Sequence, residues 1–156
     1  MKKISVFLIM SLILISCKTN TATQLDNKTE VALKGNWSIT SVTYPGQAYI
    51  KVTSFEVADS QCFVGSNWSF VSNNNKGQMD LTKSGCGVFG SPITWFINKE
   101  GNFVFKILAT GEKAKNVKEG YVLKVANLTE NTFQLIDTIS VGGKLTDVVY
   151  QFQRTI

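Results

Sequence analysis

The chain has 156 residues, a formal net charge of +5, 44% hydrophobic residues and no histidine. Its length predicts one folded domain that is large enough to bury a core. The lack of histidine removes the commonest general base and metal ligand, and the scattered charges argue against a nucleic-acid partner.

The first sixteen residues have the pattern of a secretory signal peptide. Lys2 and Lys3 make a basic start, and the apolar run Ile4–Ile15 follows, interrupted only by two serines. A bilayer span takes about 20 apolar residues, so this run is too short to cross a membrane and fits the apolar core of a signal. We expect residues 1–16 to be removed, which lowers the net charge from +5 to +3 through the loss of both lysines.

The segment Leu14-Ile15-Ser16-Cys17 resembles the lipobox of bacterial lipoprotein precursors: an aliphatic residue, a tolerant position, a small residue and a cysteine. The resemblance implies that the Cys17 thiol receives a diacylglyceryl group and becomes the lipidated N-terminus. Two or more acyl chains, such as palmitate, hold a protein stably on a membrane, whereas one chain binds only marginally. The alternative is an ordinary signal whose cysteine is incidental.

Residues 17–33 are expected to form the lipidated cysteine and a flexible tether, and residues 34–156 the folded domain. The stretch 18–32 is polar and contains no aromatic residue, glycine or proline, which is typical of a tether. Because Lys18 rather than aspartate follows Cys17, analogy with enteric sorting indicates the outer membrane of the cell envelope. The sequence does not distinguish its periplasmic from its outward face.

From Lys34 onward, short segments with period-two alternation lie between turn residues, which is the pattern of an all-β barrel or sandwich. Hairpin turns are expected at residues 73–77, 98–101 and 142–143, because Asn and Gly tolerate positive φ. The segment 48–57 also suits a short helix, and 109–119 is either loop or helix. The expected strands are Gly35–Thr43, Ala48–Val57, Asn67–Ser72, Gln78–Thr82, Ile93–Asn98, Asn102–Leu108, Tyr121–Val125, Thr132–Asp137 and Thr146–Arg154.

This number of antiparallel strands predicts an up-and-down β-barrel of about eight strands. Closing the sheet removes exposed strand edges, and an eight-stranded barrel holds either packed side chains or one small ligand. A two-sheet β-sandwich is the alternative.

Cys62 and Cys86 remain as a pair once Cys17 is acylated, and a pair in an exported domain favours a disulfide. Closing the loop between them is worth about 3–4 kcal/mol in the chain-entropy model. Two buried free thiols and a metal-binding pair are the alternatives. Glycines around Cys86 indicate a tight loop, which is either a turn pinned by the disulfide or a portal.

The start of the first strand, Leu33-Lys34-Gly35-Asn36-Trp37, resembles the Gly-x-Trp motif of the lipocalin and wider calycin families. The resemblance implies that Gly35 lets the chain turn in, that Trp37 plugs the closed end of the barrel and that Arg154 lies across its indole. The stretch 62–70 is similar to one in small lipocalin-like lipoproteins of Bacteroidetes-type organisms. The Thr-Asp-Tyr motif of larger lipocalins is absent, which argues against a spacious, open cavity.

The aromatic side chains on inward positions are the feature that indicates a ligand. If they line an apolar pocket, the protein binds a small hydrophobic molecule, such as a fatty acid or lipid, in the cell envelope. If they only form a core, the protein is a non-catalytic accessory subunit whose solid barrel binds an envelope protein. The candidate ligand-binding residues are Phe70, Trp95, Phe103, Phe105 and Tyr121.

No arrangement of residues supports catalysis, since no serine nucleophile has an identifiable base and no phosphate-binding loop is present. We therefore expect neither an enzyme nor a cofactor nor a metal site. The carboxylates show no spacing of a paired acid and base, and we expect them to be solvated surface acids: Glu56, Asp59, Asp80, Asp137 and Asp147.

Overall fold

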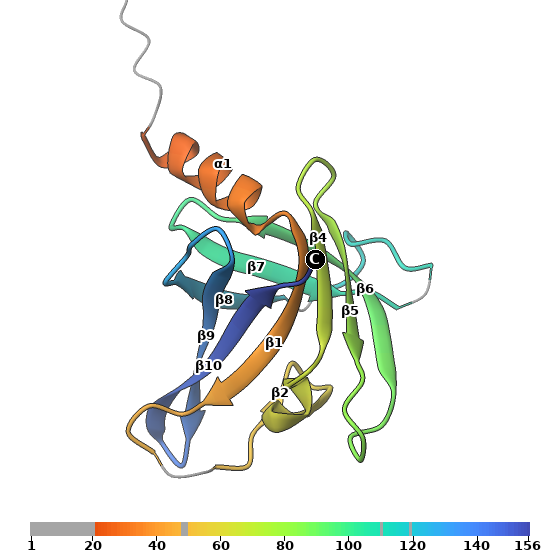
Figure 1. Cartoon of the computed structure of the whole chain (residues 1–156), viewed down its shortest axis with the longest axis vertical. Helices are drawn as coiled ribbons and strands as arrows, with labels where there is room; N and C mark the ends of the chain where they lie inside the picture. The colour runs from red at the N-terminus through yellow and green to blue at the C-terminus, as the bar shows by residue number, and fades with distance from the viewer. Residues whose placement is uncertain (1–20, 48–49, 110, 119) are drawn as a thin grey trace, which may run out of the picture.

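Eight antiparallel strands close into a barrel in the computed structural model, which describes residues 21–47, 50–109, 111–118 and 120–156 (Figure 1). The order of neighbouring strands is β1-β10-β9-β8-β7-β6-β5-β4, and β4 pairs with β1 to complete the circle. The barrel prediction is confirmed, and the sandwich alternative is wrong. The strands of the barrel are β1 (Gly35–Thr43), β4 (Asn67–Val71), β5 (Lys76–Leu81), β6 (Phe89–Ile97), β7 (Asn102–Ile107), β8 (Tyr121–Ala126), β9 (Thr132–Val141) and β10 (Lys144–Arg154).

Strand β1 closes the barrel unevenly. It pairs with β10 over residues 37–43, from Trp37 opposite Arg154 to Thr43 opposite Val149. Its pairing with β4 covers only residues 35–38, opposite residues 67–70. Past that point β1 and β4 separate, and the chain between them supplies a small hairpin of β2 (Thr53–Ser54) and β3 (Ala58–Asp59), followed by the 3-10 helix η1 (Ser60–Phe63).

The structure corrects one segment of the sequence-based expectation and decides between the alternatives for another. The expected strand Ala48–Val57 is wrong: in its described part only Thr53–Ser54 is strand, and the rest is loop and turn. Its buried apolar residues, Val52 and Phe55, pack into the barrel core from a loop, so their burial does not require a strand. The segment 109–119, expected as loop or helix, contains turns and loop where the structure describes it.

The expected tether is helical where the structure describes it. Helix α1 spans Thr21–Leu33, while residues 17–20 lie outside the described part of the chain. Its composition is that of a weak helix, and its C-terminal turn is held by tertiary contacts: Leu33 is fully buried, and a Glu30 side-chain oxygen accepts a hydrogen bond from the backbone N–H of Ile97 at 3.0 Å. Packing thus overrides local propensity here, as is common in proteins.

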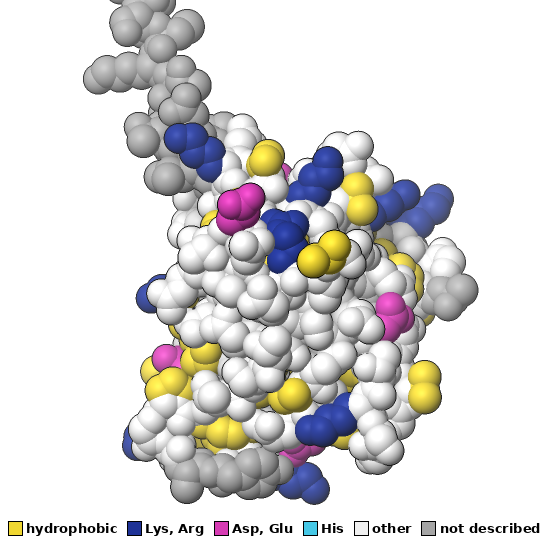
Figure 2. All heavy atoms as spheres, in the orientation of Figure 1, with side chains coloured by type: hydrophobic (Ala, Val, Ile, Leu, Met, Phe, Trp, Pro, Cys, Tyr) yellow, Lys and Arg dark blue, Asp and Glu magenta, His cyan; other side chains and the backbone are white. Residues whose placement is uncertain are grey.

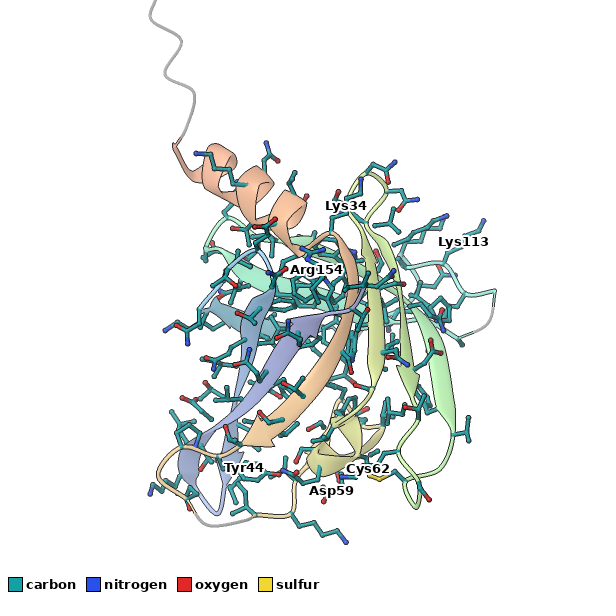
Figure 3. The ribbon with its side chains drawn as sticks, viewed as in Figure 1. Lys34, Tyr44, Asp59, Cys62, Lys113 and Arg154 are labelled. Carbon is teal, nitrogen blue, oxygen red and sulfur yellow. A yellow bond between two sulfur atoms is a disulfide. The ribbon has the colours of Figure 1, made fainter. Side chains whose placement is uncertain are left out.

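The two ends of the barrel have different structures. Lys34 and Arg154 lie at the end that carries α1, whereas Tyr44, Asp59 and Cys62 lie at the opposite end, beside β2 and η1 (Figure 3). We call these the closed end and the mouth. No helix in the described part of the chain is long and apolar enough to span a membrane.

Candidate ligand-binding site at the barrel mouth

The closed end is sealed by Trp37 and Arg154. Trp37 is fully buried, its Nε1 donates to the Leu33 carbonyl at 2.7 Å, and the Arg154 guanidinium lies 4.1 Å from the centre of its ring. Arg154 also donates to the backbone carbonyls of Ala32 and Lys34, each at 2.9 Å. A cation that binds carbonyls at a helix C-terminus stabilises that helix, so one side chain joins α1, β1 and β10.

Gly35 is required by this arrangement. Its φ is +126°, and a Cβ at this position would lie 2.5 Å from Nη1 of Arg154. The three residues expected at the barrel end, Gly35, Trp37 and Arg154, are therefore brought together by the structure.

Four of the five predicted ligand residues form a packed interior. Phe70, Trp95, Phe103 and Phe105 are almost completely buried. Their rings contact one another, with centroids 5.2 Å apart for Phe70 and Trp95 and 5.6 Å apart for the stacked pair Trp95 and Phe103. The expectation that these four line an open cavity is corrected: they fill the space that they were expected to surround.

The mouth is plugged by two aromatic residues that the sequence analysis did not select, Phe55 and Phe63. The buried ring of Phe55 is the centre of the plug, since four aromatic rings surround it at centroid distances of 5.0–5.4 Å: Phe63, Phe105, Tyr121 and Tyr150. The plug therefore continues the aromatic core up to the mouth.

Phe55 is held in the barrel by a strained turn. Phe55 and Glu56 have φ values of +54° and +57°, and the Val57 N–H donates to the Ser54 carbonyl at 3.0 Å. A hairpin turn with two residues of positive φ favours Asn-Gly, and a residue with a Cβ costs about 1–2 kcal/mol in this conformation. Ring burial must offset that cost, which explains why propensity alone does not predict this turn.

Hydrogen bonds hold the hairpin against the barrel wall. The Ser54 hydroxyl lies 2.5 Å from the Tyr150 hydroxyl, and the Tyr121 hydroxyl donates to the Phe55 carbonyl at 2.8 Å. The Tyr44 and Ser60 hydroxyls are also hydrogen-bonded to each other. Burial raises the pKa of Tyr150 above its usual range, so its hydroxyl stays protonated at neutral pH.

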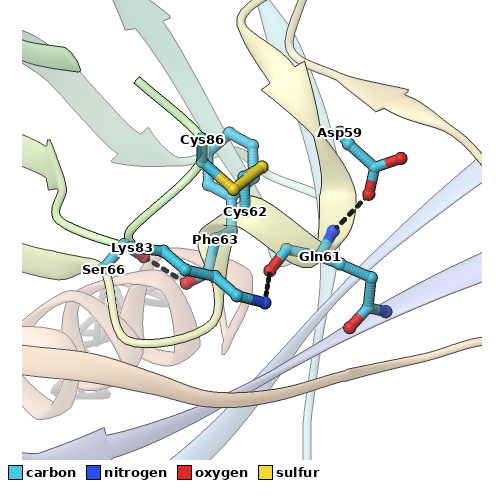
Figure 4. Close-up of a disulfide and its surroundings, with 7 residues drawn as sticks. All are labelled: Asp59, Gln61, Cys62, Phe63, Ser66, Lys83 and Cys86. Carbon is cyan, nitrogen blue, oxygen red and sulfur yellow. Dashed lines mark hydrogen bonds between the residues drawn. A yellow bond between two sulfur atoms is a disulfide. The ribbon is translucent and has the colours of Figure 1, made fainter. Parts of the chain in front are cut away.

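The predicted disulfide fixes the base of the plug. Cys62 in η1 is bonded to Cys86 in the loop between β5 and β6, with Cα atoms 5.6 Å apart (Figure 4). Beside it, the Lys83 ammonium donates to the Gln61 carbonyl at 2.8 Å, and Asp59 accepts from the Gln61 N–H at 2.9 Å. The disulfide prediction is confirmed, and the glycine-rich loop is a turn pinned by the disulfide.

A groove of about 260 Å³ lies beside the plug. Ligand pockets usually measure about 300–1,000 Å³, so this groove holds a very small molecule or part of a larger one. Tyr121 is the predicted ligand residue that lines it, and the Phe105 ring lies 5.2 Å from Tyr121 beneath it. The apolar lining consists of Phe55, Val57, Phe89, Ile107, Val117 and Tyr121.

Asp137 points into the barrel, and the expectation of a solvated surface acid is corrected. Its cross-strand partner is Val148, which is fully buried, and directly paired residues lie on the same face of a sheet. Burial raises the pKa of Asp137 above its usual value. The alternation Phe133, Leu135, Asp137 in the sequence already carried this signal.

Among the other carboxylates, Glu56 and Asp147 are exposed as expected, while Asp59 and Asp80 are partly buried. Asp59 caps η1 through one carboxylate oxygen, while its other oxygen is buried without a hydrogen-bond partner, and Asp80 accepts a hydrogen bond from Gln78 at 3.0 Å. In the described residues, no group of three or more His, Cys, Asp or Glu side chains is placed to hold a metal ion. Cys17 lies outside the described residues.

Asp137→Asn is expected to raise the melting temperature at pH 7.5. The folded-state pKa of Asp137 lies above its unfolded value, so the unfolded chain releases this proton first and ionisation destabilises the fold as the pH rises. The gain should shrink at pH 3, where the carboxyl is protonated in both states. Thermal unfolding of the parent and the variant at the two pH values measures the gain in melting temperature. An equal gain at both pH values would show that ionisation of Asp137 is not its cause.

A known domain family matches most of this sequence. The family model of the lipocalin-like domain matches residues 33–135. Solved structures similar to the chain include a lipocalin-like protein from Bacteroides uniformis ATCC 8492, with 13% identity and a TM-score of 0.49, covering 80% of this chain and 99% of that one. Bovine odorant binding protein, in complex with a selenium-containing odorant, has 11% identity and a TM-score of 0.47, and the match covers 81% of this chain and 73% of that one. Lobster apocrustacyanin A1 has 11% identity and a TM-score of 0.47, and the match covers 86% of this chain and 69% of that one.

A search of curated proteins finds no match. The family model covers well over half of the sequence, including every strand from β1 to β8 and the plug between β1 and β4. The chain therefore belongs to the family of lipocalin-like domains.

Proposed function

We propose that this protein is a membrane-anchored lipocalin-like lipoprotein of the cell envelope that binds a small hydrophobic ligand or lipid, without catalysis, at the mouth of its barrel. The observation that carries the proposal is the apolar groove beside Phe55 and Tyr121, which continues into an aromatic interior. Ligand sites of this kind are mostly apolar and lined with aromatic side chains.

The plug defines how much room a ligand has. With Phe55 in place, a ligand can use the groove beside the ring but not the space that the ring fills. If the hairpin tip moves outward, the space of the Phe55 ring joins the groove, and the rings of Phe105, Tyr121 and Tyr150 become its wall. A bound ligand would thus make the contacts with these three rings that the Phe55 ring makes when no ligand is bound.

The position of α1 supports a definite orientation on the membrane. Three residues separate Cys17 from Thr21, the first residue of α1, and four extended chain steps reach at most about 14 Å. Because α1 joins the barrel at its closed end (Figure 1), an acylated Cys17 would hold the closed end toward the lipid and leave the mouth facing away. On the face shown in Figure 2, Lys and Arg side chains lie toward both ends of the barrel, so the orientation depends on the short link between Cys17 and α1.

A second function is favoured by the packed interior. Phe70, Trp95 and Phe103 leave no room for a ligand in their present positions. If the plug never opens, the protein is a solid barrel that serves as an accessory subunit of an envelope protein complex.

A titration distinguishes these functions. The mature chain with Cys17→Ala, which carries no acyl groups, is titrated with the neutral reporter N-phenyl-1-naphthylamine. Saturable fluorescence enhancement that octan-1-ol reverses supports ligand binding. The absence of saturable binding would favour the accessory subunit.

Cys17→Ala should also release the protein from membranes, because the lipid chains are the only anchor that we propose. In the producing cells, membrane fractionation combined with metabolic acyl labelling tests this. We expect the parent chain to be labelled and membrane-bound, and the variant unlabelled and soluble. An unlabelled variant that stays on the membrane would exclude the proposed anchor, and Cys86→Ala is a control that should not affect labelling.

A further inference from the structure

Asp137 occupies an unusual position in the barrel. Within the described strands, the alternation places three charged residues on the inward-facing side, Asp137, Lys144 and Arg154. Lys144 is exposed at the tip of the β9–β10 hairpin. Arg154 lies at the closed end, over Trp37 (Figure 3). Asp137 lies toward the mouth, with the buried Val148 opposite it on β10. The interior near the mouth therefore carries a carboxylate, and the cationic residue on the same face of β10, Lys144, is four residues farther along the strand and exposed.

Asp137 belongs to the same part of the barrel as the Phe55 plug, and Tyr150 connects the two. Tyr150 is paired with Leu135, two residues from Asp137 on β9, and the Asp137 charge acts on its hydroxyl. The Tyr150 ring lies 5.4 Å from the ring of Phe55, and its hydroxyl is hydrogen-bonded to Ser54. A ligand that replaced the Phe55 ring would therefore lie against the Tyr150 ring and near the Ser54 and Tyr150 hydroxyls. Asp137 is two residues along β9 from Leu135, the pairing partner of Tyr150.

The plug has two parts that are held differently. Helix η1 is bonded covalently to the β5–β6 loop through Cys62 and Cys86. The tip of the preceding hairpin is held by hydrogen bonds and by burial of the Phe55 ring, against the cost of two residues with positive φ. The disulfide restrains η1 covalently, whereas no covalent bond restrains the tip, so the tip is the part of the plug that can move outward while η1 stays in place.

We propose that the Phe55 ring occupies a ligand subsite and that Asp137 makes this subsite selective for apolar molecules that carry an amine. The inference rests on the proposed ligand-binding function and specifies its ligand class. The apolar body replaces the Phe55 ring among Phe105, Tyr121 and Tyr150, and the ammonium group pairs with the Asp137 carboxylate. Aromatic faces also attract cations, whereas an anionic ligand such as a fatty acid meets a like charge that weakens its binding.

Stability considerations agree with a binding role for this residue. Asp137 is half-buried, and its charge is disfavoured by burial, so it costs stability in the empty protein. A bound ammonium group would compensate the buried charge. The acidic or ionisable groups that face this region from the other elements are Tyr150 of β10, Tyr121 of β8, Tyr44 in the loop after β1 and Glu56 of the hairpin turn.

The test compares three ligands with the same chain length and different head groups. Octylamine, octan-1-ol and octanoate displace N-phenyl-1-naphthylamine from the mature Cys17→Ala chain at pH 8, where the amine is protonated and the acid is ionised. We expect octylamine to displace the reporter at about tenfold lower concentration than octanoate, with octan-1-ol between them; a tenfold ratio corresponds to 1.4 kcal/mol.

Two variants assign this preference to Asp137. Asp137→Asn should bring the ratio of octylamine to octanoate close to one and leave octan-1-ol unchanged. Asp147→Asn is the matched control, because Asp147 lies on the same β9–β10 hairpin, is exposed and accepts a hydrogen bond from Thr138 on the outer face. It should keep the parent ratio. Thermal unfolding verifies that both variants are folded.

A third variant tests the subsite itself. Phe55→Ala removes the ring from the plug and should bind octan-1-ol at least about threefold more tightly than the parent chain, because no ring has to be displaced. An amine preference that is absent from the parent, or that survives in Asp137→Asn, overturns the selectivity. Unchanged octan-1-ol affinity in a folded Phe55→Ala variant overturns the subsite. In both cases the proposed function stands as long as the reporter binds saturably. No saturable reporter binding, with or without Phe55, overturns both the inference and the proposed function.

Discussion

Trp37→Ala is expected to lower the free energy of unfolding by about 3–5 kcal/mol, the range measured for large buried aromatic residues. The ring is fully buried, packs edge-on against Phe133 at 4.6 Å and lies under the Arg154 guanidinium. Its removal leaves a cavity at the closed end and a Leu33 carbonyl without its indole donor. Loss of this bond also weakens the attachment of α1 to the barrel.

Urea unfolding of the parent and the variant measures this effect. Phe96→Ala is the matched control, because Phe96 lies on the outer face of β6 and is 42% exposed. Its substitution should cost about 1 kcal/mol or less. A Trp37→Ala variant as stable as the Phe96→Ala control would show that the closed end does not depend on this residue.

Removal of the Cys62–Cys86 disulfide should have the second-largest effect on stability. Cleavage of a native disulfide in a small exported domain usually costs about 2–5 kcal/mol. Here the bond joins η1, which carries Phe63, to the β5–β6 loop. Without it, the entire plug is held only by packing and hydrogen bonds, so we expect the mouth to loosen before the barrel unfolds.

Thermal unfolding with and without a reducing agent provides the measurement. Reduction should lower the melting temperature of the parent, whereas Cys62→Ser/Cys86→Ser should melt at the lower temperature under both conditions. Thiol titration of the unreduced, denatured protein with Cys17→Ala should detect no free thiol. Two titratable thiols, or a parent melting temperature unaffected by reduction, would contradict the structural role assigned to this bond.

The barrel can be predicted from the sequence because the patterns that indicate its strands and turns are local. Strand β1 was predicted with the bounds that the structure has, and the alternation of Phe103, Phe105 and Ile107 identified the inward face of β7. Turn residues such as Asn98 and Gly101 marked the hairpins, and the Gly35-Asn36-Trp37 motif with Arg154 indicated which strands close the barrel. Each of these signals depends only on neighbouring residues or on one pairing.

The plug and α1 were not predictable in this way, because tertiary contacts determine them. Phe55 adopts a positive φ that favours glycine, and its ring is buried by residues from three distant strands. Helix α1 has a polar composition that is typical of a tether, yet Leu33 and Glu30 attach its end to the barrel. Whether an aromatic interior is filled or hollow also depends on the loop that enters it, which strand alternation does not report.

Asp137 is a different case, because its position in the alternation of β9 indicates the barrel interior. The residue continues the inward alternation of Phe133 and Leu135, but a carboxylate among apolar residues was assigned to the surface because buried carboxylates are rare. An acidic residue that breaks an apolar inward pattern is a candidate for a functional role, since such positions often lower stability in exchange for binding.

The central claim is that a hydrophobic ligand binds at the plugged mouth of the barrel. Backbone amide NMR of the mature Cys17→Ala chain, titrated with octan-1-ol, tests it most directly. We expect saturable chemical-shift changes at Phe55, Val57, Ile107 and Tyr121, which surround the groove, and small changes at Trp37 and Arg154 at the closed end. Shift changes that do not saturate, or that concentrate at the closed end while the mouth is unaffected, would contradict the account.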